Sequence, residues 1–277
     1  MTNYLLTLVT MVAFAANSVL CRLALGEHQI DAASFTVIRL ASGAATLWLL
    51  CKATRTSSLR NKGSWFGALM LFLYAATFSF AYLSLDTGTG ALILFGTVQL
   101  VMILFSLYRG ERLHTLEWTG VLLASAGLVY LLLPGVTAPS IQGFLLMLVA
   151  GIGWGSYSLL GRGSTQPLLD TSANFIRTLL FVLLLGLVMM AHLDLTSRGV
   201  WLAILSGAIA SGMGYALWYR VLAGLTATQA AVFQLSVPVI AAAGGVIFMA
   251  ETVSLRLTLA SLMVLGGIAL VIARRAK

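Results

Sequence analysis

The sequence is built almost entirely from apolar runs about as long as a membrane is thick, separated by short polar breaks. A helix needs about 20 apolar residues to cross the hydrocarbon core of a bilayer. Ten runs have this character, at about residues 4–25, 33–52, 64–83, 88–108, 116–133, 142–160, 172–191, 199–222, 228–249 and 256–273. The longest break, residues 53–63, is too short for a soluble domain. We therefore expect an all-α polytopic membrane protein whose function resides among its helices.

The composition supports the same class. Of 277 residues, 60% are hydrophobic and 9% are charged, and the mean hydropathy is +1.01. Soluble domains carry roughly 25% charged residues, so this chain is too poor in charge to cover a water-exposed surface. The net charge of +8 does not indicate a nucleic-acid partner, because Lys and Arg lie mostly at the ends of the apolar runs. The first run lacks a basic start and is expected to stay as a membrane helix, not to be cleaved as a signal peptide.

The cysteines and histidines predict neither a metal site nor a cofactor. Cys21 and Cys51 lie in or beside apolar runs and lack metal-ligand spacing. His28, His114 and His192 are isolated from one another along the chain. We interpret the cysteines as small buried hydrophobic residues.

The distribution of basic residues predicts the orientation, because Lys and Arg accumulate on the cytoplasmic side of membrane proteins. With the N-terminus inside, the inner breaks hold eleven basic residues: Lys52, Arg55, Arg60, Lys62, Arg109, Arg112, Arg162, Arg220, Arg274, Arg275 and Lys277. The outer breaks then hold three, Arg22, Arg198 and Arg256. Both termini are therefore expected to be cytoplasmic.

The two halves of the chain, residues 1–135 and 136–277, match each other in order. The matches are Ser18, Leu20 and Arg22 with Ser158, Leu160 and Arg162; Ser34, Ile38 and Arg39 with Ser172, Ile176 and Arg177; Trp65 and Tyr82 with Trp201 and Tyr219; and Ala91, Glu111, Leu122 and Gly127 with Ala231, Glu251, Leu262 and Gly267. Because each half has an odd number of helices, the second must enter the membrane in the opposite orientation. Inverted repeats are a recurring architecture of transporters. We expect ten transmembrane helices as two inverted five-helix repeats around a central cavity.

Several residues form a pattern that resembles the drug/metabolite transporter superfamily. They are Gly151-Ile152-Gly153-Trp154-Gly155-Ser156 in the sixth run, Arg39 and Arg177 early in the second and seventh, Pro238 in the ninth, and Glu111 and Glu251 after the fourth and ninth. The chain is similar to the EamA-type branch, and most similar to the YddG-type amino-acid exporters. The resemblance implies ten helices, a central cavity, and export of amino acids or related metabolites, aromatic ones among them. The expected location is a bacterial inner membrane. One departure is Val98, which occupies the position that matches Pro238.

A transport site in such a fold is expected near the membrane midplane, between the halves. The candidate cavity residues are Asn17, Tyr74, Phe78, Tyr82, Gln99, Trp154, Tyr157, Ser211, Tyr215, Trp218 and Gln234. Six of them form two stripes with helical spacing, one per half, and packing between helices is the alternative interpretation of these stripes. The expected cavity is apolar, with amide and hydroxyl groups and without a central carboxylate. It favours neutral or zwitterionic solutes and disfavours nucleotide sugars.

Charged and kink-forming residues suggest how the two entrances are controlled. Arg39 and Arg177 lie inside helices, where an ionised side chain needs a partner. The expected pairs are Arg39–Glu251 at the outer entrance and Arg177–Glu111 at the inner entrance. A static bond from each arginine to backbone carbonyls is the alternative. Pro238 is a candidate hinge in the middle of the ninth helix.

The acidic residues bear on energy coupling. Asp86, Glu111 and Glu251 are at helix ends or breaks, and this favours gradient-driven export over the alternative, a proton-coupled drug or metabolite exporter. A channel is the alternative from a different class, although rings of charge are not visible in the sequence. An enzyme is not expected, since no catalytic constellation is found at membrane depth. The expected partners are a small-molecule substrate and the lipid bilayer, and no nucleic acid or obligate protein partner is inferred.

Overall fold

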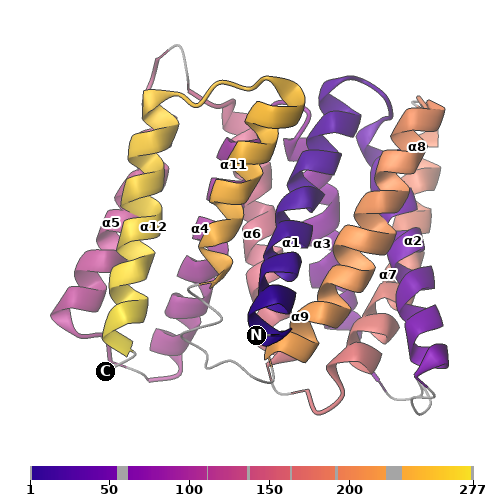
Figure 1. The fold of residues 1–277 in the computed structure, drawn as a ribbon, viewed down its shortest axis with the longest axis horizontal. Helices are drawn as coiled ribbons and strands as arrows, with labels where there is room; N and C mark the ends of the chain where they lie inside the picture. The colour runs from indigo at the N-terminus through magenta and orange to yellow at the C-terminus, as the bar shows by residue number, and fades with distance from the viewer. Residues whose placement is uncertain are drawn as a thin grey trace.

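The computed structural model describes residues 2–54, 62–110, 112–135, 138–162, 164–190, 193–222 and 233–275. Within these ranges the regular structure is helical, and the only β-type pairing is an isolated bridge between Ile30 and Leu195. The helices stand side by side in one bundle (Figure 1). They are α1 Thr2–Gly26, α2 Ala32–Ala53, α3 Trp65–Ala81, α4 Thr87–Tyr108, α5 Thr115–Leu132, α6 Ile141–Gly161, α7 Pro167–Val188, α8 Ser197–Ile204, the π-helix η2 Leu205–Met213, α9 Gly214–Leu222, α11 Ser236–Met249 and α12 Leu255–Arg275.

The expected fold class, a ten-helix polytopic membrane protein, is confirmed in the described residues. Eight helical segments are long and apolar enough to cross a membrane, and α8, η2 and α9 together form one of them. Two shorter apolar helices, α3 and α11, complete the bundle. The start of the ninth predicted run, residues 228–232, lies outside the described residues. Helix α7 begins five residues before the predicted 172, because Pro167 suits the first helical turn and Asp170 is favourable there.

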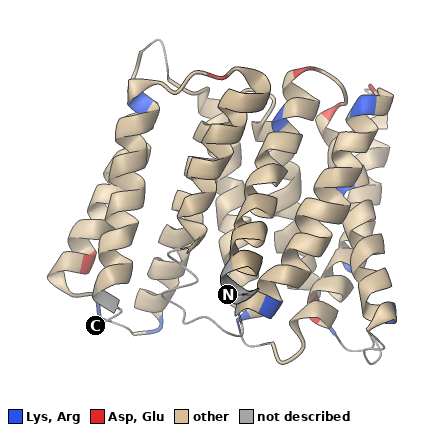
Figure 2. Ribbon diagram, viewed as in Figure 1, with Lys and Arg blue, Asp and Glu red and all other residues tan. Residues whose placement is uncertain are grey.

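Polar side chains cap the starts of several helices. Asp31 accepts a hydrogen bond from the Ser34 amide at 2.8 Å, and Ser64 and Thr196 cap α3 and α8 in the same way. Such caps satisfy backbone N–H groups that have no partner inside the helix. Charged residues gather mainly at the two ends of the bundle, and its middle is largely uncharged (Figure 2).

The bundle has two ends that differ in their contacts. We call the end where α1 begins and α12 ends the terminal face, and the opposite end, where α3 ends and α4 begins, the distal face (Figure 1). At the distal face the α1–α2 and α7–α8 turns are bonded together. The Asp31 amide donates to the Asp194 carbonyl at 3.0 Å, and the Thr196 amide donates to the Gln29 carbonyl at 3.0 Å. The two halves of the chain are thus joined at this face.

The packing partners of the helices follow a regular pattern. Helix α3 packs on α6, and the α8–η2–α9 span packs on α1; α4 packs on α6, and α11 packs on α1. Three further pairs each combine one helix from either half: α2 with α7, α4 with α11, and α5 with α12. The pair α5–α12 forms one edge of the bundle in Figure 1. The helices nearest the centre therefore come from both halves.

Helices α2 and η2 approach each other closely at Gly207. A Cβ atom added at Gly207 would lie 2.7 Å from the backbone carbonyl carbon of Arg39, and it would also contact the Ser42 hydroxyl. Glycine is required at this position because any side chain would push the two helices apart. This contact fixes where the Arg39 side chain leaves α2.

Candidate functional site

A small pocket lies at the centre of the bundle, between the two halves of the chain. Its wall is formed by Phe14, Asn17, Ser18, Tyr74, Phe78, Leu94, Phe95, Trp154, Ala210, Ser211 and Tyr215. These residues belong to α1, α3, α4, α6, η2 and α9. The pocket volume is about 20 Å³, which is enough for about one water molecule. In this conformation the surrounding side chains therefore close the central pocket around very little space.

A buried polar network runs along one side of this pocket. The Asn17 amide donates to the Tyr74 hydroxyl at 3.1 Å and accepts from the Ser206 hydroxyl at 2.6 Å. Arg39 donates from Nη2 to the Tyr74 hydroxyl at 2.8 Å and from Nε to the Ser211 hydroxyl at 3.4 Å. The network joins α1, α2 and α3 of the first half to η2 of the second. Polar groups held this way in an apolar interior fix the relative positions of the helices that carry them.

The π-helical geometry of η2 explains why two serines of one span reach this network. Ser206 and Ser211 are five residues apart, and in a π-helix backbone hydrogen bonds join residues five apart. This geometry brings both hydroxyls to the side that faces α1 and α2. The sequence predicted one uninterrupted α-helix over 199–222, and this prediction is wrong in the middle of the span. π-Helical segments inside α-helices occur frequently at functional sites.

Aromatic rings form another part of the pocket wall. Trp154 stacks on Tyr215, with ring centroids 4.9 Å apart and an interplanar angle of 22°. It also stacks on Tyr157 at 5.7 Å, and Phe14 meets its edge at 6.4 Å. Trp218 contacts Phe14 at 5.8 Å. These rings provide a large apolar surface with defined geometry at the centre of the protein.

A second and larger cavity, of about 210 Å³, lies at the terminal face. It is formed by Gly63, Ser64, Tyr157, Leu160, Gly161, Ser164, Pro167, Asp170, Thr171, Asn174 and Tyr219. Asp170 accepts hydrogen bonds from the Gly63 amide at 2.8 Å and from the Ser164 hydroxyl. Tyr157 belongs to this cavity and stacks on Trp154 of the central pocket. The pair of rings Trp154 and Tyr157 therefore forms the boundary between the two spaces.

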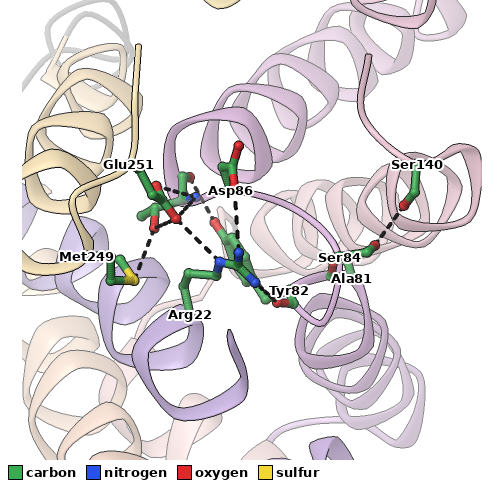
Figure 3. Close-up of polar contacts among 9 residues, drawn as sticks. Arg22, Ala81, Tyr82, Ser84, Asp86, Ser140, Met249 and Glu251 are labelled. Atoms are coloured by element: carbon green, nitrogen blue, oxygen red, sulfur yellow. Dashed lines mark hydrogen bonds and ion pairs between the residues drawn. The ribbon is translucent and has the colours of Figure 1, made fainter. Parts of the chain in front are cut away.

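At the distal face an ionic cluster joins the halves (Figure 3). Arg22 lies 3.3 Å from Glu251 and 3.5 Å from Asp86, and it donates to the Tyr82 carbonyl at 3.1 Å. Glu251 also accepts from the Thr87 amide at 2.9 Å and from its hydroxyl at 3.1 Å. A carboxylate at the first turn of a helix is favourable, and here it comes from the other half of the chain. We call Arg22, Tyr82, Asp86, Thr87 and Glu251 the distal cluster.

The predicted cavity residues fall into different parts of the structure. The central pocket brings together six of them: Asn17, Tyr74, Phe78, Trp154, Ser211 and Tyr215. Tyr157 lines the terminal-face cavity, Tyr82 belongs to the distal cluster, and Trp218 packs on Phe14. Gln99 and Gln234 line neither cavity. Gln99 is buried on α4, and Gln234 comes just before α11 and is half-buried.

The predicted pair Arg39–Glu251 is wrong. Arg39 is one residue past the second turn of α2, where its side chain reaches Tyr74 and Ser211. Glu251 follows the end of α11 at the distal face, where Arg22 is its ionic partner. The sequence assigned Arg39 to the outer entrance, whereas its guanidinium group contacts the wall of the central pocket.

The second predicted pair, Arg177–Glu111, is only partly described, since Glu111 lies outside the described residues. Arg177 donates to the backbone carbonyls of Lys62 at 2.6 Å and Ala173 at 3.2 Å. These bonds match the alternative prediction of a static tie to backbone carbonyls.

Pro238 does not lie in the middle of a continuous helix, as the sequence suggested. The ninth span is interrupted by a turn at Leu235, and Pro238 lies in the first turn of the new helix that begins at Ser236. Proline is tolerated in a first turn because the missing N–H has no helical partner there.

The contributors that sequence reasoning missed include Ser206, Ser18, Asp170, and Arg22 acting as the partner of Glu251. Asp170 and Arg22 carried a usable signal, since each is a charged residue within about two turns of a helix end. Ser206 and Ser18 carried none, because a serine in an apolar helix more often bonds its own backbone.

The fold and these sites define a class of protein. A multi-pass helical membrane protein with a central polar and aromatic pocket between its two halves has the architecture of a membrane transporter. Comparison with known proteins identifies the family. Residues 141–273 match the model of the EamA-like transporter family. The chain belongs to this family, within the drug/metabolite transporter superfamily, and is a transporter and not an enzyme.

Relatives and a solved structure cover nearly the whole chain. Protein PA1977 of Pseudomonas aeruginosa, described as uncharacterized, is 53% identical over 98% of this chain and 94% of its own length. The transporter YoaV of Bacillus subtilis is 20% identical over 88% of each chain. A transporter of Archaeoglobus fulgidus is 26% identical over 87% of this chain and 86% of its own. One crystal structure, with 20% sequence identity, superposes with a TM-score of 0.66 over 97% of this chain and 98% of its own, and supports the fold.

Proposed function

We propose that the protein exports small neutral or zwitterionic metabolites, with apolar and aromatic amino acids as the main class, by alternating access. The observation that carries this proposal is the central pocket, which combines stacked aromatic rings with a buried network of hydroxyl, amide and guanidinium groups. The rings suit an apolar or aromatic body, and the polar network suits the charged groups of an amino acid. This proposal includes the resemblance to YddG-type amino-acid exporters.

Alternating access rests on the two halves, residues 1–135 and 136–277, acting as inverted repeats. In an inverted repeat of this kind, α3 of the first half corresponds to the α8–η2–α9 span of the second, and α1 corresponds to α6. If α3 packs on α6, the α8–η2–α9 span should therefore pack on α1, and both contacts occur. The distal face is held closed by the distal cluster and by the bonded turns, whereas a cavity lies at the terminal face. Transport would require the opposite arrangement, with the distal cluster separated.

The proposed location is a bacterial inner membrane, with both termini in the cytoplasm. Three arginines, Arg22, Arg198 and Arg256, are at the distal ends of helices. The basic residues of the other breaks that the structure describes are at the terminal face: Lys52, Lys62, Arg109, Arg112, Arg162 and Arg220. By the positive-inside rule the terminal face is then cytoplasmic. In this orientation the 210 Å³ cavity faces the cytoplasm, which is where an exporter collects its substrate.

We propose that the substrate gradient drives transport. One observation favours a second candidate, proton-coupled export. Asp170 is a carboxylate that lines the terminal-face cavity, and proton-coupled carriers usually place an ionisable group along their transport pathway. Proton-coupled export therefore predicts that Asp170→Asn abolishes the pH dependence of transport. Gradient-driven export predicts no net proton movement with substrate, which a pH-sensitive dye inside the liposomes would measure.

The proposal is tested with the purified protein in liposomes, by measuring uptake of labelled phenylalanine, leucine, a purine and a sugar. We expect saturable uptake of the amino acids. Trp154→Ala should remove most of this uptake, because it removes the ring on which Tyr157 and Tyr215 stack. The matched control is Trp201→Ala, since Trp201 is 64% exposed on the outside of the bundle. Equal uptake by Trp154→Ala and the wild type would place the pathway elsewhere.

A further inference from the structure

We propose that the guanidinium group of Arg39 binds the carboxylate of the transported solute, and so restricts transport to solutes with a free carboxylate. This inference rests on the proposed function and names the group through which the substrate is recognised. The sequence analysis assigned Arg39 to a pair with Glu251 at the outer entrance, whereas the structure places Arg39 beside the central pocket.

Arg39 is fully enclosed and contacts three residues of the pocket wall. Its side chain is 1% exposed. The guanidinium carbon lies 4.9 Å from the centre of the Phe78 ring and 5.1 Å from the centre of the Tyr74 ring. The Ser211 hydroxyl accepts from Nε at 3.4 Å. A solute in the pocket would therefore share Tyr74, Phe78 and Ser211 as neighbours with the guanidinium group.

The guanidinium group is left with an unused donor. Nε and Nη2 have hydroxyl partners, but Nη1 is buried and has no hydrogen-bond partner among the described residues. Leaving a buried charged donor without a partner costs more than leaving a neutral one. Cation–π contacts with Tyr74 and Phe78 offset part of this cost, but they supply no acceptor for the free N–H groups.

No carboxylate of the described residues neutralises Arg39. The ion pairs in the described ranges join Arg22 to Asp86 and Glu251, and Arg198 to Glu27. Intramembrane arginines are costly and almost always have a counter-ion or line a pathway. A cation that is buried, unneutralised and next to a pocket is therefore suited to an anionic group supplied by the substrate.

The chemistry of the pocket selects the kind of anion. Arg39 is the single buried Lys or Arg among the described side chains, so the pocket can neutralise one negative charge and not the several charges of a nucleotide diphosphate. A planar carboxylate matches the forked guanidinium donor set. The ammonium group of an amino acid can face the rings of Trp154 and Tyr215 or the Asn17 carbonyl oxygen, because aromatic faces attract cations.

The experiment compares an amino acid with its carboxamide. L-Phenylalanine and L-phenylalaninamide are tested as competitors of labelled phenylalanine in liposomes, with the wild type, Arg39→Gln and Arg39→Lys. The wild type should prefer the acid. Arg39→Gln should weaken the apparent affinity for the acid by about 10- to 100-fold, the range for a hydrogen bond to a charged group, and leave the carboxamide within a few-fold. Arg39→Lys should recover part of the preference, because it keeps the charge and loses the fork.

The control is Arg177→Gln, the equivalent position in the other half, whose guanidinium bonds backbone carbonyls. It should leave the ratio between acid and carboxamide unchanged. Equal loss of both ligands in Arg39→Gln, or an unchanged preference for the acid, would overturn the proposal. If Arg39→Gln fails to fold, the competition experiment with the wild type tests the proposal by itself. Equal competition by the acid and the carboxamide would overturn the proposal.

The outcome separates this inference from the proposed function. If the wild type transports no amino acid, the proposed function fails. The Arg39 assignment is then tested by thermal stabilisation of the wild type with 3-phenylpropionate and with 3-phenylpropionamide. Stabilisation by the acid alone would support the assignment, and equal or absent stabilisation would overturn it.

Discussion

Replacing Gly207 with alanine tests the packing that positions Arg39. The added Cβ would lie 2.7 Å from the Arg39 carbonyl carbon, whereas nonbonded carbon atoms are stable at about 3.5–4.0 Å. The helices α2 and η2 would therefore have to separate by roughly 1 Å. Because the obstacle includes backbone, rotation of a side chain cannot remove it. We expect a cost at the upper end of the overpacking range, about 3 kcal/mol.

The same separation should disturb function, since Arg39 and Ser211 are already 3.4 Å apart and would lose their hydrogen bond. The assay is the apparent melting temperature of the purified protein in detergent at a fixed heating rate, followed by uptake in liposomes. Gly266→Ala is the matched control, because a Cβ at Gly266 meets no atom within 4 Å. It should be neutral or stabilising by about 0.5–1 kcal/mol, as expected for alanine in a helix. If Gly207→Ala and Gly266→Ala have the same apparent melting temperature, the close contact between α2 and η2 does not exist.

Three further predictions follow from the described contacts. A double-mutant cycle of Arg22→Ala and Glu251→Ala, read by melting temperature, should show coupling of about 0.5–3 kcal/mol, and the same cycle for Arg39 and Glu251 should show none. Asn17→Ala leaves the hydroxyl of Ser206 without its acceptor; we expect a loss of about 1–3 kcal/mol in stability and reduced uptake, and wild-type values in both assays would contradict the network. Pro238→Ala should change stability little, because the helix is already interrupted at Leu235; a loss of transport without a change in stability would instead assign Pro238 a role in movement.

Much of the fold could be predicted because a bilayer imposes one simple constraint. Each crossing needs a long apolar run, and charged residues must lie near its ends, so run length and Lys and Arg positions predicted the helices. Helix α7 was predicted too short because Asp170 and Thr171, near its start, interrupt the apolar run. The π-helix could not be predicted, because residues 205–213 have the same apolar and small composition as the α-helical spans.

The candidate site was harder to predict, because depth along a helix does not determine which way a side chain points. Tyr74, Phe78 and Tyr82 follow one stripe of α3, yet Tyr74 and Phe78 line the pocket and Tyr82 belongs to the distal cluster. Gln99 has the expected depth on α4, but Leu94 and Phe95 line the pocket. Arg39 was assigned to the outer entrance by counting turns from the start of the helix. Its side chain instead reaches sideways to Tyr74 and Ser211, because Gly207 lets η2 approach α2.

The central claim is that one pocket between the two halves carries the solute by alternating access. Counterflow tests it most directly: liposomes that contain the protein are loaded with unlabelled phenylalanine and diluted into a trace of the labelled amino acid. A carrier of this kind predicts transient accumulation of label above its equilibrium level, and Trp154→Ala should abolish the accumulation. Uptake that rises in proportion to concentration, without accumulation above equilibrium, would contradict the claim and indicate a channel.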